Sequence, residues 1–154
     1  MKDVSLKLAN SADEEFLEEL FCDVRSVEFI AAGMSVLQLK PLLAMQYNVQ
    51  KHSYKGNFLN AENFIIELGD EKIGRLLIDR RERKVHLIDI SILGDFRGRG
   101  IGGCLLEQLK TDAETISLSV FKTNFGALKL YEKHGFAVTD DDGMYFKMEW
   151  KNVG

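Results

Sequence analysis

The sequence has little of several features that would indicate particular classes of protein. Its 154 residues include two cysteines and one proline. Cys22 and Cys104 lie far apart and outside any paired-cysteine motif, so we favour two reduced thiols over a disulfide or a catalytic cysteine. No apolar run approaches about 18 residues, and no basic, apolar leader opens the chain. We therefore expect a cytoplasmic protein with no membrane partner.

Basic charge is also scarce. The chain has 20 Lys and Arg against 24 Asp and Glu, a net charge of −4, which argues against a nucleic-acid partner or a membrane-surface role. Histidine, cysteine and carboxylate residues form no cluster that suggests a metal site, and no Ser/His/Asp set stands out. The length fits a single domain over residues 1–154, which can bury about 70% of the surface of its unfolded chain.

Hydrophobic periodicity predicts a mixed α/β fold with many hairpins. Ser11 and Glu14 form a capping-box pattern, Pro41 is expected to start or kink the second helix, and Gly135 is expected to end the last helix. We expect strands at 4–8, 63–68, 72–79, 85–93, 116–120, 136–139 and 144–150, helices at about 11–28, 35–50, 100–113 and 124–134, and a loop at 51–60.

The most informative segment is the glycine-rich run at residues 97–103, Arg-Gly-Arg-Gly-Ile-Gly-Gly. It lies between an apolar strand and an amphipathic helix, which is the arrangement of a phosphate site. Glycines let the backbone approach a ligand closely, and N–H groups at a helix N-terminus attract anions. The segment therefore predicts a phosphate-bearing ligand.

Three interpretations compete for this run. Gly98, Gly100 and Gly103 match G-x-G-x-x-G, but the motif comes late in the chain, and Phe121-Lys122 follow the next strand where a dinucleotide site has an acid. No Lys-Ser or Lys-Thr follows the glycines, which argues against an ATP-binding P-loop. A turn needed only for backbone geometry remains possible, although it does not explain the two arginines.

Two blocks resemble the GNAT superfamily of acetyl-CoA-dependent N-acetyltransferases. Residues 97–102 match R/Q-x-x-G-x-G/A, and residues 124–136 are similar to N-x-x-A-x-x-L-Y-E-K-x-G-F at the usual distance downstream. The resemblance implies the GNAT acyl-CoA N-acyltransferase fold, acetyl-CoA as cosubstrate and no metal. It also implies direct acetyl transfer to a primary amine of a small molecule or a lysine. A non-catalytic acyl-CoA-binding module is the alternative, and a homodimer is common in the superfamily.

The resemblance also implies which residues hold coenzyme A. Backbone N–H groups of the glycine run would hold the pyrophosphate, the two arginines would add charge, and the end of the fourth strand would pair with the pantetheine amides. Asn124 would contact the coenzyme, although it is also a good N-cap residue. The expected coenzyme-binding residues are Ile90, Ser91, Ile92, Arg97, Gly98, Arg99, Gly100, Ile101, Gly102, Gly103, Asn124 and Tyr131.

The same resemblance assigns the chemistry. Tyr131 occupies the family's position for the acid that protonates the leaving thiolate, and an ordinary tyrosine stays protonated at neutral pH. Its alternative role is simple packing on its helix. A backbone N–H near Ile92 would stabilise the oxyanion. His86 is the candidate base, and strand alternation is expected to turn Asp89 to the opposite face.

The acceptor is less well indicated. The family's ribosomal-protein N-terminal acetyltransferases commonly have a glutamate base five residues before the asparagine, and this chain has Ser119 there. That departure argues against a peptide N-terminus. The first two helices and the loop between them are expected to form the acceptor pocket, with Glu28, Gln46, Tyr47, Tyr54 and Phe58 as candidates.

Overall fold

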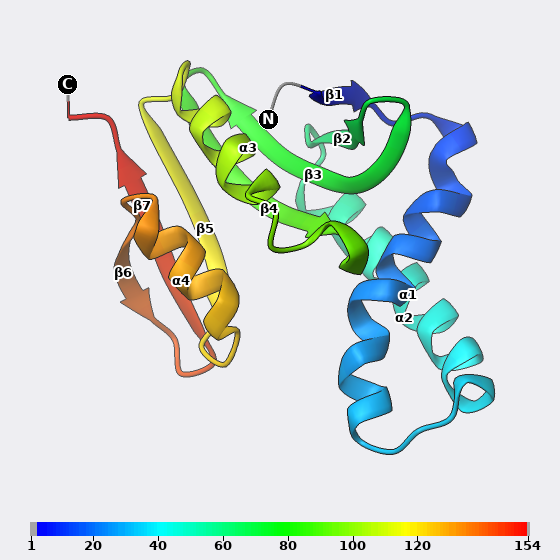
Figure 1. Cartoon of the computed structure of the whole chain (residues 1–154). Helices are drawn as coiled ribbons and strands as arrows, with labels where there is room; N and C mark the ends of the chain where they lie inside the picture. The colour runs from blue at the N-terminus through cyan, green and yellow to red at the C-terminus, as the bar shows by residue number, and fades with distance from the viewer. Residues whose placement is uncertain (1–2, 154) are drawn as a thin grey trace.

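A seven-stranded mixed sheet is the centre of the computed structural model, which describes residues 3–153 apart from the side chains of Val27 and Glu28. Its order is β1-β2-β3-β4-β5-β7-β6, and β4 and β5 are the parallel pair (Figure 1). The predicted mixed α/β fold is confirmed. The strands are β1 (Val4–Leu8), β2 (Glu62–Leu68), β3 (Glu71–Arg81), β4 (Lys84–Ile92), β5 (Thr115–Phe121), β6 (Ala137–Asp141) and β7 (Tyr145–Lys151).

Helices cover both faces of the sheet. On one face, α1 and α2 enclose a small core with Ile65 of β2, while α3 and α4 pack over the larger core on the other face. Each fully buried leucine or isoleucine contributes about 1.5–3 kcal/mol, so the larger core provides most of the apolar stabilisation. The helices are α1 (Glu14–Ala31), α2 (Val36–Asn57), α3 (Ile101–Lys110) and α4 (Phe125–Lys133), with 3-10 turns η1 (Ser11–Asp13) and η2 (Gly94–Phe96).

The first two helices differ from the sequence prediction. The capping box before α1 uses Asn10 and Asp13 rather than Ser11 and Glu14. Helix α2 begins at Val36, so Pro41 lies inside it and does not start it. The same helix continues through most of the segment expected to be a loop, 51–60. Polar composition suggested a loop there, but the Tyr54 ring packs edge-on against Phe58, four residues on, with centroids 6.4 Å apart. Phe58 in turn stacks on His86 of β4, and this tertiary contact favours continued helix.

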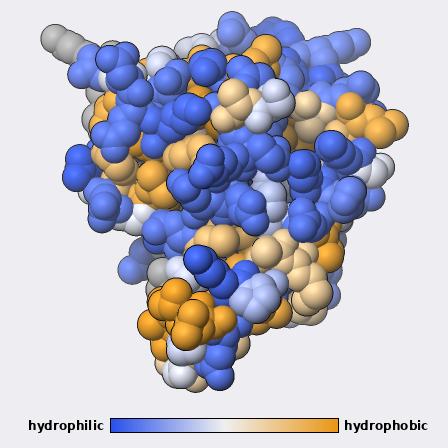
Figure 2. Space-filling view, turned by 90° about the vertical axis from the view of Figure 1, so that its right-hand side faces the viewer, coloured by the Kyte–Doolittle hydropathy of each residue, from blue (hydrophilic) through white to orange (hydrophobic). Residues whose placement is uncertain are grey.

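The turn between α1 and α2 carries exposed apolar side chains. They form the apolar area at the lower end of Figure 2. Ile30, Val36 and Leu37 are all exposed, Leu37 to 85%. This end of the helical hairpin therefore projects beyond the core.

Candidate active site

Strands β4 and β5 run side by side for only part of their length. Their parallel register extends from Lys84↔Thr115 to Leu87↔Leu118, whereas β4 remains paired with β3 as far as Ile92. Where the two strands part, a cleft of about 470 Å³ opens. Side chains of α1, α2 and α4 line it together with the strands, so the cleft connects both faces of the sheet. Its size is typical of a small-molecule site.

A β-bulge decides which β4 side chains point the same way. The register with β3 skips Ile88, so one extra residue is inserted at that point. The residues paired with His86 and Asp89 are Asp79 and Leu77, two apart on β3, and therefore point to the same side. The expectation that Asp89 faces away from His86 is wrong, because the bulge reverses the alternation between them.

His86 shares that face but lies outside the cleft. Its Nδ1 is 2.9 Å from the Ser117 hydroxyl oxygen, and its ring stacks on Phe58 with centroids 5.8 Å apart. Burial lowers the pKa of His86, and the nearby Asp79 charge opposes that effect. Neither His86 nor its two contacts is among the described residues that line the cleft. The structure thus does not bring the expected base to the other site residues.

Asp89 is the carboxylate among the described side chains that line the cleft. Its Oδ2 accepts hydrogen bonds from Arg75, at 2.7 Å from Nη2 and 3.2 Å from Nε, and from the Ser91 hydroxyl at 2.8 Å. Burial and then the charge of Asp89 raise the pKa of two phenols in the cleft, Tyr54 and Tyr131. Burial, and to a lesser degree Asp89, thus favour the protonated form of both phenols.

Tyr131 comes from the second turn of α4 and is 7% exposed. Its ring packs against Phe136 with centroids 5.6 Å apart, which holds the side chain at the cleft wall. Burial and the Asp89 charge raise the pKa of Tyr131 to about 12. The phenol is a hydrogen-bond donor throughout the neutral pH range.

Asn124 sets the start of α4. Its Oδ1 accepts a hydrogen bond from the Ala127 N–H at 3.2 Å, so it has the N-cap role that was one of its two expected roles. It also lines the cleft, which leaves the coenzyme contact open as a prediction. At the other end, Gly135 adopts φ +88° and ends the helix as expected.

The loop after β4 turns through two glycines with positive φ, Gly98 at 75° and Gly100 at 82°. A Cβ added at either position would meet nothing within 4 Å, so the loop borders open space and not packed side chains. Gly100 precedes α3, and no described side chain caps that helix, so its first N–H groups remain available. This open backbone fits the pyrophosphate of coenzyme A.

The other glycines of the run permit helix packing. A Cβ on Gly103 would come 2.7 Å from Nε2 of His134, and one on Gly102 would come 3.3 Å from Cδ2 of Leu130. Both glycines therefore allow α3 to approach α4 closely. Ile101, between Gly100 and Gly102, is 1% exposed, and its side chain packs in the larger core.

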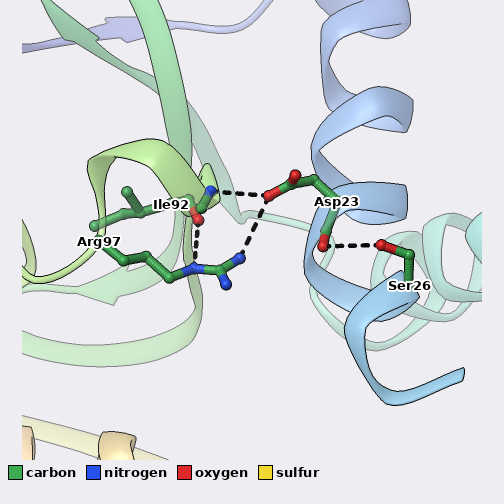
Figure 3. Close-up of polar contacts among 5 residues, drawn as sticks. Asp23, Ser26, Ile92 and Arg97 are labelled. Atoms are coloured by element: carbon green, nitrogen blue, oxygen red, sulfur yellow. Dashed lines mark hydrogen bonds and ion pairs between the residues drawn. The ribbon is translucent and has the colours of Figure 1, made fainter. Parts of the chain in front are cut away.

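The two arginines of the run differ in their contacts. Arg97 donates from Nε to the Ile92 carbonyl at 2.9 Å, and its Nη2 is 3.5 Å from Oδ2 of Asp23 on α1 (Figure 3). It therefore ties the end of β4 to the first helix. Arg99 is exposed, with its guanidinium carbon 5.0 Å from the Phe96 ring centre, and forms no ion pair with a described side chain. Of the two arginines, Arg99 is therefore the one more available to bind a phosphate.

The end of β4 presents alternating environments. Ile90 and Ile92 pack against the larger core, while Ser91 points to the side of Asp89. Beyond Leu87 the strand has no register partner in β5 among the described residues. Pairing of this edge with the pantetheine amides stays a prediction that the geometry allows.

The family model for the acetyltransferase (GNAT) domain matches residues 60–138, which are 79 of the 154 residues. The chain belongs to the GNAT family. The match includes β4, the glycine loop, α3, β5 and α4, the elements that form the cleft and its coenzyme side. The recognition made from the two sequence blocks is thereby confirmed.

Relatives of this GNAT domain agree with the assignment. The chain is 31% identical over 72 residues to the probable N-acetyltransferase san of Drosophila melanogaster, covering 43% of the chain and 39% of that protein. It is 42% identical over 60 residues to an N-alpha-acetyltransferase of Saccharolobus solfataricus, covering 35% and 36%. The chain thus spans well under half the length of these two relatives.

A solved structure shows the same fold over nearly the whole chain. The PaiA N-acetyltransferase of Thermoplasma acidophilum, solved in complex with coenzyme A, aligns with a TM-score of 0.72 at 22% identity. The alignment covers 97% of this chain and 99% of the other. At this identity the likeness establishes the GNAT fold, and the first two helices are part of it.

The acceptor side of the GNAT domain differs from expectation. Of the candidates, Tyr54 lines the cleft, whereas Gln46, Tyr47 and Phe58 are not among its described lining residues. The Tyr47 hydroxyl instead donates to a glutamate of α1 at 2.6 Å. The side chain of Glu28 lies outside the described residues.

The cleft residues that sequence reasoning missed include Arg25, Arg75 and Tyr145. Arg75 had a usable signal, because it is the single charge in the apolar run Ile73–Ile78. Arg25 had none, since one arginine on an amphipathic helix resembles an ordinary surface residue.

The described residues contain no group of three or more His, Cys, Asp or Glu side chains able to hold a metal ion. In the same part of the chain, no helix is long and apolar enough to cross a membrane.

Proposed function

We propose that this GNAT domain is an acetyl-CoA-dependent N-acetyltransferase that transfers the acetyl group directly to a primary amine. The single observation that carries the proposal is the cleft between β4 and β5. Its lining includes Arg97 and Gly102 of the glycine run, the protonated Tyr131 and the carboxylate of Asp89. The relatives named N-acetyltransferases support the reaction class.

The donor side is formed by the backbone. The N–H groups around Gly98 and Gly100 bind the pyrophosphate at the positive end of the α3 dipole. Arg99 adds a charge-assisted contact from the exposed side of the loop. The free edge of β4 beyond Leu87 pairs with the pantetheine amides as an added strand would. The thioester is then directed into the cleft.

The chemistry is one acyl transfer. The amine nitrogen attacks the thioester carbon, a C–N bond forms, the C–S bond breaks, and the sulfur leaves as a thiolate. Tyr131, protonated and buried in the cleft wall, offers its proton to that sulfur. The backbone N–H groups near Ile92 stabilise the oxyanion that forms during attack.

Asp89 replaces His86 as the group that receives the proton of the amine. Asp89 and Tyr131 both line the cleft, whereas His86 does not. Hydrogen bonds from Arg75 and Ser91 hold the Asp89 carboxylate in one orientation. The amine is thus aligned between a proton acceptor and the thioester.

The test has two parts. Calorimetric titration with acetyl-CoA is expected to show one site per chain, and no binding at millimolar concentration would contradict the proposal. Thiol release is then followed over a panel of primary amines. Tight acetyl-CoA binding without turnover on any amine would instead indicate a non-catalytic acyl-CoA-binding module.

A further inference from the structure

Four charged side chains among the described residues line the cleft, three arginines and one aspartate. Arg75 is paired with Asp89 at 2.7 Å, and Arg97 faces the carboxylate of Asp23 at 3.5 Å. Arg25 is the remaining cation. The cleft therefore has an excess of positive charge, although the whole chain has a net charge of −4.

Arg25 lies on α1, one turn after Phe21, and is half-buried. Its guanidinium carbon is 5.3 Å from the centre of the Phe21 ring, so the side chain lies over an aromatic face within the cleft. It forms no ion pair with any carboxylate among the described side chains. The positive charge of Arg25 lowers the pKa of Tyr54 and so partly offsets the rise that burial causes.

A half-buried guanidinium without an anion is unusual. Removing a charge from water is unfavourable unless a partner compensates, and arginine presents a rigid fork that matches a carboxylate. Stacking on Phe21 holds the fork in place before any ligand arrives, which reduces the entropy lost on binding. The position therefore favours an anionic ligand, since no described side chain supplies a carboxylate to Arg25.

We propose that the acceptor is a primary amine that also carries a carboxylate, and that Arg25 binds this carboxylate. The inference rests on the proposed acetyl transfer and names its substrate class. The amine lies at Asp89 and Tyr131, and the carboxylate lies toward α1, within the same cleft. A polyamine is disfavoured, because its second ammonium group would meet the like charge of Arg25 in the same cleft.

The experiment compares matched acceptors on the wild type and on Arg25→Gln. The panel contains glycine, β-alanine and 4-aminobutanoate, the carboxamide of each, a short peptide with an acidic second residue, and spermidine. In the wild type, at least one carboxylate acceptor is expected to exceed its carboxamide in kcat/KM. A preference for the aminocarboxylates would indicate a small-molecule acceptor, and a preference for the peptide would indicate a protein N-terminus with an acidic second residue.

Arg25→Gln is expected to raise the KM of the carboxylate acceptor by about 10- to 100-fold, the loss typical of one charge-assisted pair. The KM of acetyl-CoA and the turnover of the carboxamides should stay unchanged. Arg80→Gln is the matched control, because Arg80 lies on β3 outside the cleft and pairs with Glu62. It should leave every constant unchanged.

Each failure has its own signature. No thiol release with any amine would contradict the proposed acetyl transfer itself. Turnover that favours spermidine or the carboxamides would leave that function standing and overturn the role of Arg25. An equal loss on carboxylates and carboxamides, or a loss confined to acetyl-CoA, would also overturn it, while melting curves establish that the variant is folded.

Discussion

Replacing Tyr131 with phenylalanine removes one oxygen from the cleft wall and little else. The ring, packed on Phe136, stays in place, and no hydrogen bond from the Tyr131 hydroxyl to a described residue is lost. We therefore expect the melting temperature and the acetyl-CoA affinity to remain close to those of the wild type. The effect should be confined to the chemical step.

The expected size of that effect follows from the pKa of Tyr131, about 12. A free thiol has a pKa of about 8.5, so complete transfer of the phenolic proton to a thiolate is uphill by several kcal/mol. The phenol thus acts mainly as a strong hydrogen-bond donor to the developing thiolate, and such a bond contributes about 1.5–3 kcal/mol. We expect kcat to fall about 100-fold, within the range of general acids.

The assay is thiol release at saturating substrates, with calorimetry for acetyl-CoA binding and a pH–rate profile. Because the pKa of Tyr131 is raised, the donor remains protonated up to about pH 12, so it should cause no loss of activity between pH 6 and 10. An unchanged kcat, or a large loss of binding with normal turnover, would refute the reasoning. Tyr47→Phe is the control: its hydroxyl donates to Glu14 at 2.6 Å, outside the cleft, so it should lower stability and spare kcat.

Three other changes probe the loop and the fold. Gly100→Ala places a Cβ at φ +82°, which costs about 1–2 kcal/mol of stability, and it should also raise the KM of acetyl-CoA, whereas an unchanged KM would separate this residue from the donor site. Asp23→Asn weakens the hydrogen bond that the Asp23 carboxylate accepts from the Gly94 N–H at 2.9 Å. Calorimetry should then show weaker acetyl-CoA binding, with little change in the free energy of unfolding. Normal acetyl-CoA binding would contradict a role of Asp23 in positioning the loop. The hydrogen bond from Lys72 lowers the pKa of Asp13, so its stabilisation is present above about pH 4 and is lost as pH falls through the folded-state pKa. Urea midpoints should accordingly drop less between pH 6 and 3 in Asp13→Asn than in the wild type.

The coenzyme-binding residues could be predicted from the sequence because the features that indicate them are local. A glycine that must adopt positive φ, such as Gly100, and an asparagine that caps its own helix, such as Asn124, act within a few residues of chain. Tyr131 follows from its fixed distance to that cap. Hydrophobic patterning likewise predicted all seven strands near their observed positions, although β6 is exposed along its whole length.

The residues expected on the acceptor side could not be placed from the sequence, because their positions depend on how the strands of the sheet pair. The bulge at Ile88 is a property of the register between β3 and β4. It turns Asp89 to the same side of the sheet as His86, whereas simple alternation predicted the opposite side. The same packing put Phe58 over His86 and kept that histidine out of the cleft.

By itself, the sequence determined the family of the domain and predicted where its donor binds. Residues 97–103 and 124–136 contain the turn, the helix start and the tyrosine, all of which depend on neighbouring residues. Only the tertiary structure decided which charged side chains line the cleft. Arg25, Arg75 and Asp89 come from three separate elements and share one cleft because β4 and β5 part beyond Leu87.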